Sequence, residues 1–373
     1  MALHRQLGLD GISRVLIIRL SSIGDVANAL PVAAALLEAR PDLQISWLVE
    51  EMSAGVVEMA TGLHEVIVIP RSRWKQGRWN SISVWREYVQ LLFGLHARRF
   101  ELSLDLQGYG KSAVYALAAS APRRYGWRRM RDGSNLVSPP PAEEGECVHR
   151  TEWFLEALRP LGIVGSRPAF QLSVPKSASE SAVRLLAEQG VTLDAGFVVL
   201  NPATGDETRR WGADRFGEAA ALIFREFGLL SVLVGSGKDE ALCRTVVECS
   251  ERFGAHGDGL PRSVAGRTDI PTLAALLQMA RVQISGDTGS LHLSAALGKP
   301  VVGLYGPTDP LHAGPWDQAD NVISSSGMCS AECSSNECGL RKSPRGSSSA
   351  EAVCMEAIPV SRVMARVGQI LNG

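Results

Sequence analysis

Residues 285–292 (SGDTGSLH) combine two glycines, a carboxylate, hydroxyls and a histidine where a predicted strand gives way to a helix. We expect the helix to begin near Thr288 or Gly289. Backbone N–H groups at a helix start carry partial positive charge and bind anions, and glycine lets a ligand approach closely. His292 would lie one turn into the helix, on the same face as Thr288. The segment predicts a diphosphate site. A helix capped by Asp287 with a surface histidine is the alternative.

Residues 201–211 (NPATGDETRRW) follow an apolar run that predicts a buried strand. Arg209 and Arg210 stand side by side in this loop, directly before Trp211. Guanidinium groups form paired hydrogen bonds with phosphate oxygens. Close to an anion site at a helix start, these cations suit a leaving diphosphate. A solvated polar turn is the alternative interpretation.

Residues 21–25 (SSIGD) follow the first predicted strand of the chain. Asp25 would stand at the carboxyl end of that strand, facing a cleft. A carboxylate placed there can act as general base on a hydroxyl group. The alternative is that Asp25 only caps the following helix.

Two glycine-containing loops point away from common nucleotide folds. Residues 108–113 (GYGKSA) open a helix after a strand, but no acidic strand end follows about twenty residues later, as a dinucleotide site requires. Asp105 stands where a P-loop needs its first glycine, and Glu240 replaces the third glycine in residues 235–240 (GSGKDE). We therefore exclude a hydride-transfer enzyme and a P-loop nucleotidase, and we expect no cofactor.

The chain contains no Asp-x-Asp pair, which a magnesium-dependent sugar transferase of the single-domain type would carry. This favours neutralisation of a leaving diphosphate by helix ends and arginines, and we expect no metal ion. Four cysteines cluster near the C-terminus, with spacings unlike a zinc ribbon. An unpaired or redox role and a metal site both stay open for them. The four are Cys329, Cys333, Cys338 and Cys354.

Composition places the chain among ordinary globular proteins. It has 373 residues, 45% of them hydrophobic, so two domains with proper cores are expected. Lys and Arg number 38 and Asp and Glu 39, so the net charge of −1 leaves no overall footprint for nucleic acid. The N-terminal residues lack the apolar core of a signal peptide, and residues 27–37 are too short to span a bilayer. We expect a cytoplasmic protein.

Strands and helices alternate in the first half of the chain, which predicts a parallel sheet. The predicted helices include residues 26–40, 84–99 and 149–161. Residues 71–80 interrupt the alternation with four cations and two tryptophans, and residues 162–179 form a linker. The predicted strands are residues 14–20, 45–50, 66–70, 102–106 and 123–127.

The second half repeats this theme, with predicted strands that end in loops containing glycine. The fold class is therefore α/β, with two Rossmann-like αβα domains whose strand ends face a central cleft. We place the domains at residues 1–170 and 171–373. The last helix could pack back on the N-terminal domain.

Together these motifs resemble the bacterial heptosyltransferases of glycosyltransferase family nine. The resemblance runs in order along nearly the whole chain. It rests on RVLIIRLSSIGDVANALPVAAAL, DLQGYGKSA, PATGDETRRWGADRF, LVGSGKDE and SGDTGSLHLSAALGKPVVGLYGPTDP. It implies a GT-B enzyme whose N-terminal half takes the acceptor and whose C-terminal half takes ADP-heptose. It also implies an inverting, metal-independent transfer in lipopolysaccharide inner-core synthesis.

The resemblance also assigns roles to individual residues. Asp25 matches the family's general base, and Asp239 matches an acid that binds the donor's ribose or sugar. Arg209 stands where the family usually has lysine, a departure that changes the grip on the phosphates because arginine is longer and forked. The remaining donor residues are Thr204, Gly205, Thr268, Asp287, Thr288, Gly289 and His292. The expected acceptor residues are Ser22, Gly24, Arg71, Arg73, Lys75, Gln107 and Lys111.

The cations of residues 71–80, which include Arg78, could meet the phosphates and carboxylates of a lipid A–Kdo or core oligosaccharide acceptor. A solvated cationic loop is an equal alternative. Peripheral contact with the inner membrane would suit such an acceptor. Two further readings stay open: a non-catalytic paralogue that binds nucleotide sugars, and the same fold using a different nucleotide sugar.

Overall fold

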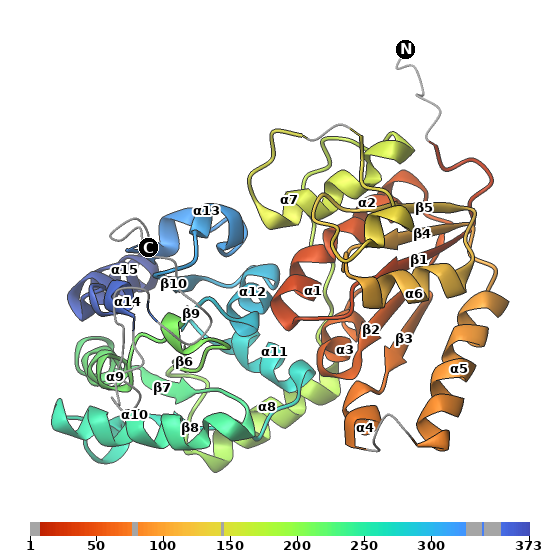
Figure 1. Cartoon of the computed structure of the whole chain (residues 1–373). Coiled ribbons are helices and arrows are strands. Elements are labelled where there is room, and N and C mark those ends of the chain that lie inside the picture. The colour runs from red at the N-terminus through yellow and green to blue at the C-terminus, as the bar shows by residue number, and fades with distance from the viewer. Residues whose placement is uncertain (1–7, 77–80, 143–144, 326–337, 339–351) are drawn as a thin grey trace. The chain divides into compact units, whose positions relative to one another are not determined.

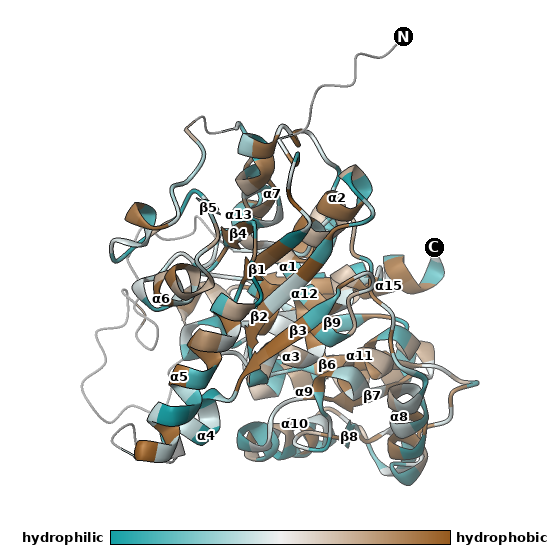
Figure 2. Cartoon of the chain, turned by 90° about the vertical axis from the view of Figure 1, so that its right-hand side faces the viewer, coloured by the Kyte–Doolittle hydropathy of each residue, from teal (hydrophilic) through white to brown (hydrophobic). Residues whose placement is uncertain are grey.

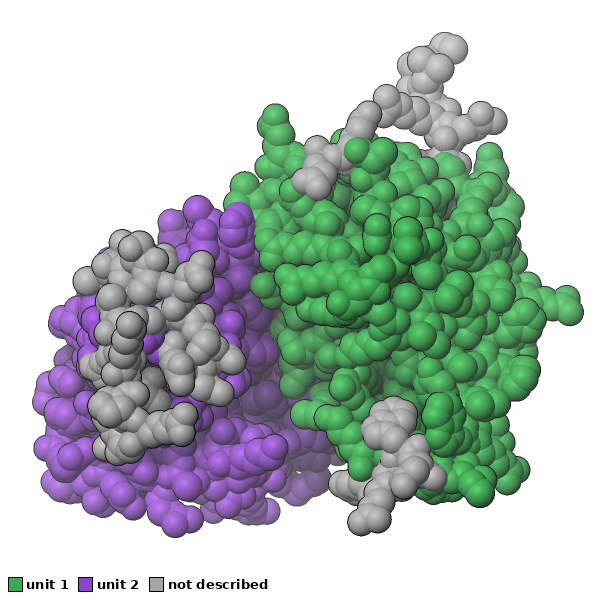
Figure 3. Space-filling model, in the orientation of Figure 1, with its two compact units in different colours: residues 1–173 green, residues 174–373 purple. Residues whose placement is uncertain are grey.

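Two parallel β-sheets, one in each half of the chain, organise the protein (Figure 1). The computed structural model describes residues 8–76, 81–142, 145–325, 338 and 352–373. The chain divides into two compact units, residues 1–173 and 174–373 (Figure 3), where the sequence predicts a boundary after residue 170. Each unit is a sheet with helices on its faces, which confirms the predicted α/β class.

The first sheet is five-stranded and parallel, in the order β3-β2-β1-β4-β5. Ile17 of the central strand lies opposite Trp47 and Leu104. Apolar side chains fill both faces of the inner strands, as a sheet covered on both sides requires. The order reverses between β1 and β4, and in parallel α/β sheets ligands commonly bind beside such a reversal, at the carboxyl ends of the strands. The strands are β1 (Arg14–Ile18), β2 (Gln44–Glu50), β3 (Glu65–Ile69), β4 (Leu102–Asp105) and β5 (Arg123–Gly126).

Helices cover both faces of this sheet. One face packs against α4, α5 and α6 through a core that includes Leu16, Ile18 and Tyr115. α1 contacts α3 and α7, and α2 contacts α7. The predicted helix over residues 26–40 is two helices, because Pro31 has no N–H and begins a new helix after Leu30. The helices are α1 (Ile23–Ala29), α2 (Pro31–Ala39), α3 (Glu51–Glu58), α4 (Arg71–Gln76), α5 (Ile82–Ala97), α6 (Gly110–Ala119) and α7 (Arg150–Leu155).

The expectation of a loop over residues 71–80 is wrong for its first part, which is α4. Trp74 is 1% exposed in the sheet's core, and its indole N–H donates to Glu87 of α5. The buried indole holds this short segment against the core, so the cations beside it stand on a helix. Residues 77–80, Arg78 among them, lie outside the described residues.

The second sheet is parallel, in the order β11-β10-β9-β6-β7-β8, and it reverses between β6 and β9. Its core joins the sheet to α9 and α10 and contains Trp211 and Phe216, whose rings meet edge to face. α11 contacts α8 and α12. The strands are β6 (Phe197–Asn201), β7 (Leu230–Leu233), β8 (Arg262–Ser263), β9 (Gln283–Gly286), β10 (Val301–Tyr305) and β11 (Val322–Ser324). The helices are α8 (Lys176–Glu188), α9 (Ala213–Phe227), α10 (Glu240–Arg252), α11 (Ile270–Met279), α12 (Gly289–Ala296), α13 (Pro310–Ala313), α14 (Val353–Glu356) and α15 (Val360–Asn372).

Helices stand at both ends of this unit. The predicted linker over residues 162–179 stops at Lys176, where α8 begins and buries Ala178 and Ala182 on one face. The last helix, α15, contacts α9 and buries Val363 and Val367 in the core of the second unit. It is therefore an integral part of that unit.

The cysteine cluster falls only partly within the described residues. Cys338 and Cys354 are buried in the core of the second unit, while Cys329 and Cys333 lie outside the described part of the chain. Among the residues that the structure describes, no group of three or more His, Cys, Asp and Glu is placed to hold a metal ion. No helix in that same part of the chain combines the length and apolar character needed to cross a bilayer.

Candidate active site

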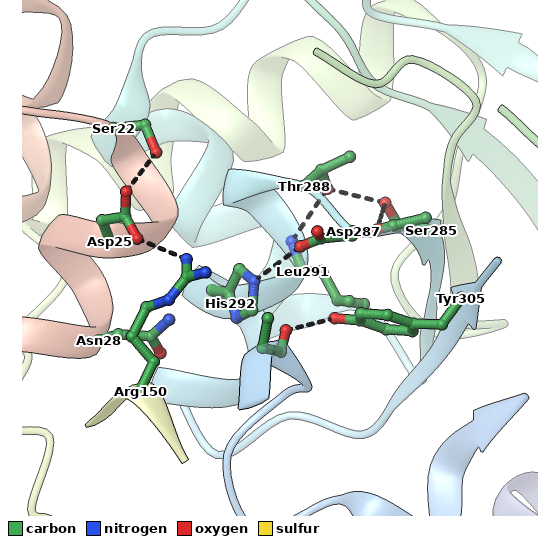
Figure 4. A network of polar contacts seen from close by, with 12 residues as sticks. Ser22, Asp25, Asn28, Arg150, Ser285, Asp287, Thr288, Leu291, His292 and Tyr305 are labelled. Carbon is green, nitrogen blue, oxygen red and sulfur yellow. Dashed lines mark hydrogen bonds and ion pairs between the residues drawn. The ribbon is translucent and has the colours of Figure 1, made fainter. Parts of the chain in front are cut away.

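Asp25 lies in the first turn of α1, directly beyond the carboxyl end of β1. Its Oδ2 pairs with Arg19 Nη2 at 2.7 Å, and its Oδ1 accepts from Arg150 Nη1 at 2.6 Å. Ser22 Oγ donates to the same carboxylate at 3.2 Å (Figure 4). The side chain is 21% exposed, so the carboxylate is fixed in direction and still reaches solvent.

Arg19 is the innermost member of this cluster, with a side chain only 5% exposed. Its Nη1 donates to the carbonyl oxygen of Leu106 at 2.6 Å, and its guanidinium carbon lies 5.1 Å from the ring centroid of Phe154. Burial lowers the pKa of the Arg19 guanidinium from its usual value, and the charge of Asp25 opposes that shift. Arg19 therefore holds Asp25 from inside the fold.

Asp105 and Gln107 fix the neighbouring strand end. Gln107 Oε1 accepts from the backbone N–H groups of Leu20 and Ser21, which ties the loop after β4 to the loop after β1. Asp105 is buried and accepts from the Gly108 N–H, and burial raises the pKa of its carboxyl. Gln107, predicted to bind acceptor, is 5% exposed and holds these two backbone groups.

The predicted acceptor cations have partners within the first unit. Arg71 and Lys111 both reach Glu50 Oε1, and Arg73 pairs with Glu87 at 2.6 Å. Lys75 is exposed on α4. Gly24, also expected at the acceptor, is buried inside α1. Arg71 follows β3 and Lys111 follows β4, so both stand at the carboxyl edge of the sheet, as Asp25 does, and Glu50 partly neutralises them.

In the second unit, Asp287 joins two of the predicted donor residues. Its Oδ2 pairs with Arg209 Nη1 at 2.7 Å, and its Oδ1 lies 3.2 Å from His292 Nε2 (Figure 4). Arg209 also pairs with Asp206 at 3.2 Å, and its side chain is 36% exposed. Asp287 therefore orients both the arginine and the histidine, and the guanidinium keeps an exposed edge for a ligand.

α12 begins at Gly289, as the sequence predicts. Thr288 is the capping residue, and its Oγ1 accepts from the Leu291 N–H. The expectation of a cap at Asp287 with a surface histidine is wrong, because His292 is 5% exposed. Thr288 Oγ1 also lies 2.8 Å from Ser285 Oγ, so the turn between β9 and α12 is held by hydroxyl groups.

Glycine at position 286 lets two loops meet. A Cβ atom there would lie 3.0 Å from the carbonyl oxygen of Arg209 and 3.1 Å from Thr204 Cγ2. Thr204 Oγ1 donates to the Asp206 carbonyl at 2.6 Å, which shapes the loop that carries Arg209. The loops after β6 and β9 therefore touch at the point where the strand order of the second sheet reverses.

The other predicted donor residues lie apart from these contacts. Asp239 accepts from the backbone N–H and hydroxyl of Ser236, so it caps its own turn. Thr268 is half-buried in the loop before α11, and the space beside Gly205 is open. The structure thus brings Arg209, Asp287, Thr288 and His292 together.

The sequence reasoning missed Arg19, Arg150 and Asp206. Arg19 had a visible signal, because a cation inside an otherwise apolar strand needs a partner. Arg150 is 125 residues from Asp25 in the chain, and no local pattern links them.

Solved structures share the fold of this chain. A glycosyl transferase family 9 structure from Veillonella parvula matches with a TM-score of 0.77 and 21% identity, covering 96% of this chain and 97% of that chain. The E. coli heptosyltransferase WaaC with ADP-2-deoxy-2-fluoro heptose matches with a TM-score of 0.67 and 23% identity, covering 95% and 99%. The fold is therefore that of two-domain glycosyltransferases.

The sequence comparisons define the family. A model of glycosyltransferase family 9 (heptosyltransferase) matches residues 88–343, and the chain belongs to this family. The lipopolysaccharide core heptosyltransferase OpsX of Haemophilus influenzae is 23% identical, with 83% of each chain covered. The protein is a glycosyltransferase, and the resemblance stated from its motifs is confirmed.

Replacing Arg19 should reveal how much the fold depends on the Asp25 cluster. Arg19→Met keeps the apolar contacts but leaves Asp25 without its buried partner, and it should lower the free energy of unfolding by about 2–4 kcal/mol. Arg150→Met removes a partner that is 30% exposed and should cost less than about 1 kcal/mol. Urea denaturation measures both. Equal losses for the two variants would contradict a special role for Arg19.

Proposed function

We propose that this glycosyltransferase moves a heptose from ADP-L-glycero-D-manno-heptose to the Kdo or heptose region of the lipopolysaccharide inner core. The family assignment supports heptosyl transfer. The name of the OpsX relative supports the acceptor, and the donor analogue held by WaaC supports the donor. An acceptor of this kind is linked to lipid, so the enzyme must act at a membrane surface. We place this activity on the cytoplasmic side of the membrane.

The observation that carries the proposal is the carboxylate of Asp25, aimed by Arg19 and Arg150 and still 21% exposed. We assign it the role of general base. It takes the proton of an acceptor hydroxyl while that oxygen attacks the anomeric carbon of the heptose. The bond to ADP breaks in the same step, so a single displacement inverts the anomeric centre.

The departing ADP gains negative charge, and the second unit supplies groups to meet it. Arg209 offers its exposed guanidinium edge, and the N–H groups at the start of α12 offer a partial positive charge. Asp287 holds Arg209 in place, so the guanidinium needs little reorganisation as the charge develops. His292 braces the second oxygen of Asp287.

Asp25→Asn should lower turnover by roughly two to four orders of magnitude, because the amide cannot take the proton. Binding of ADP should stay unchanged, because Asp25 belongs to the acceptor unit. Initial rates of ADP release and calorimetric titration with ADP measure the two effects. Retention of more than about a tenth of wild-type turnover would remove Asp25 from the mechanism.

Arg209→Ala should weaken ADP binding and lower turnover, with a combined cost on the order of 2–5 kcal/mol. His292→Ala should cost less, about 1–3 kcal/mol, since it loses one hydrogen bond to a charged group. Arg209→Lys keeps the charge without the fork and tests the family's usual residue. If Arg209→Ala binds ADP as tightly as wild type, Arg210 becomes the candidate for the phosphate contact.

We also propose that transfer needs no metal ion, because Arg209 and the start of α12 supply the positive charge. Treatment with EDTA should leave the rate of transfer unchanged. The rate is compared before chelation, after chelation and after Mg²⁺ is added back. Loss of activity with EDTA and its return with Mg²⁺ would contradict this mechanism.

A non-catalytic paralogue is the second candidate, since the donor contacts alone would suffice for binding. The oriented and accessible Asp25 favours an enzyme, because a binding protein has no need of a base there. Release of ADP on mixing donor and acceptor separates the two. A panel of nucleotide sugars, read by mass spectrometry, tests the choice of donor.

A further inference from the structure

Helix α5 of the first unit is apolar on two sides. Its inner side packs Val84 and Leu95 into the sheet's core. Its outer side carries a second stripe, which we call the α5 face. The α5 face consists of Ile82 (87% exposed), Trp85 (54%), Val89 (40%) and Phe93 (71%). These positions follow each other at helical spacing, so the stripe is continuous over about three turns.

The neighbouring helix extends this surface. α6 packs beside α5, and His96 Nδ1 lies 3.2 Å from Ser120 Oγ at their carboxyl ends. Val114 and Leu117 on α6 are also exposed. In Figure 1 and Figure 2, α4, α5 and α6 follow one another along one side of the first unit.

Trp85 is held in place from below. Its ring meets Tyr88 edge to face at 5.9 Å, and Tyr88 in turn meets Trp74 and Tyr115. The exposed indole is therefore the outermost ring of an aromatic series that reaches the core. A tryptophan held in this way suits the boundary between water and lipid, where its amphipathic ring is stable.

The charges around the α5 face are strongly biased. Within α4, α5 and α6, Glu87 is the single acidic residue. The Lys and Arg residues of the same helices are Arg71, Arg73, Lys75, Arg86 and Lys111. The whole chain is almost neutral, with 38 Lys and Arg against 39 Asp and Glu, so this bias is local. Arg71 and Lys111 pair with Glu50 and Arg73 pairs with Glu87, so the excess positive charge beside the stripe rests on Arg86 and Lys75, and it complements an anionic lipid surface.

We propose that the α5 face, with Val114 and Leu117, docks the protein on the surface of an anionic bilayer. The apolar side chains enter the boundary between headgroups and acyl chains, and Arg86 and its neighbours meet lipid phosphates. Two copies joined through this surface would bring its cations opposite like charges, whereas an anionic bilayer would neutralise them. A bilayer is therefore a better occupant than a second copy. The inference rests on the proposed function, because a lipid-linked acceptor gives the protein a reason to bind a membrane.

Flotation of the full chain with vesicles tests the docking surface. Vesicles of phosphatidylglycerol and phosphatidylethanolamine should bind wild-type protein at least about tenfold better than phosphatidylcholine vesicles, and high salt should weaken the binding. The variant Ile82→Ser/Trp85→Ser/Phe93→Ser should bind at least about tenfold more weakly than wild type. The control Leu136→Ser/Leu311→Ser removes leucines that are 86% and 68% exposed elsewhere and should bind as wild type.

Two more variants separate packing from charge. Ile82→Ser/Phe93→Ser leaves the contact between Trp85 and Tyr88 intact, and thermal unfolding checks that the fold persists. Arg86→Glu should bind several-fold more weakly and show less salt dependence. The proposal would be overturned if wild-type protein did not bind anionic vesicles. It would also be overturned if the triple serine variant bound them as well as wild type. A triple variant that is smaller in solution than wild type would overturn it as well, because it would indicate an interface between copies.

Measurements of transfer activity distinguish a failure of this inference from a failure of the proposed function. With a deacylated acceptor in solution, the serine variants should turn over as fast as wild type, because the α5 face touches no reacting group. With acceptor embedded in vesicles, they should be at least about tenfold slower. Vesicle binding needs neither donor nor acceptor, so it can hold when the assigned sugar is wrong. Equal rates of wild type and the serine variants on embedded acceptor would contradict the docking role.

Discussion

The ion pair between Arg19 and Asp25 governs the arrangement of the first unit's site. A guanidinium buried at the end of a central strand needs a charged partner inside the fold. Arg19 pairs with Asp25 after β1 and donates to the Leu106 carbonyl after β4. Those two strands are the pair at which the strand order reverses, so one side chain joins the two loops that flank the reversal. The carboxylate that we assign to catalysis is therefore part of the contact that holds these loops together.

In the second unit, too, an ion pair joins the two loops beside a reversal of strand order, but there the arginine is the more exposed partner. Its loops after β6 and β9 also flank a reversal of strand order, and Asp287 with Arg209 joins them. Gly286 is what allows the contact, since any Cβ there would press on the backbone of Arg209. Here the arginine is 36% exposed, where Arg19 is buried. In the first unit, Arg19 orients the carboxylate of Asp25. In the second unit, the carboxylate of Asp287 orients Arg209.

Much of this could be predicted from the sequence, because it depends on local patterns. Short apolar runs that end at glycine and hydroxyl residues predicted the inner strands and the turn before α12. The contact between Asp25 and Arg150 could not be predicted, since it joins residues 125 positions apart and depends on how α1 meets α7. α4 was missed because a six-residue helix has little periodicity of its own and depends on the burial of Trp74. The roles of Asp239 and Thr268 as donor residues stay predictions from the resemblance.

Helix α5 shows where periodicity alone misleads. An apolar stripe normally marks the side of a helix that faces the core, and a helix apolar on both sides would be expected to be buried. α5 packs on only one side, and its other stripe lies among arginines and lysines rather than under another layer. Exposed Ile, Trp and Phe side chains in one row gain nothing in water, since burying each would be favourable by about 1.5–3 kcal/mol. Such a row becomes favourable when a surface of low dielectric constant covers it during function. The bilayer that we propose as the source of the acceptor would supply that surface in every turnover.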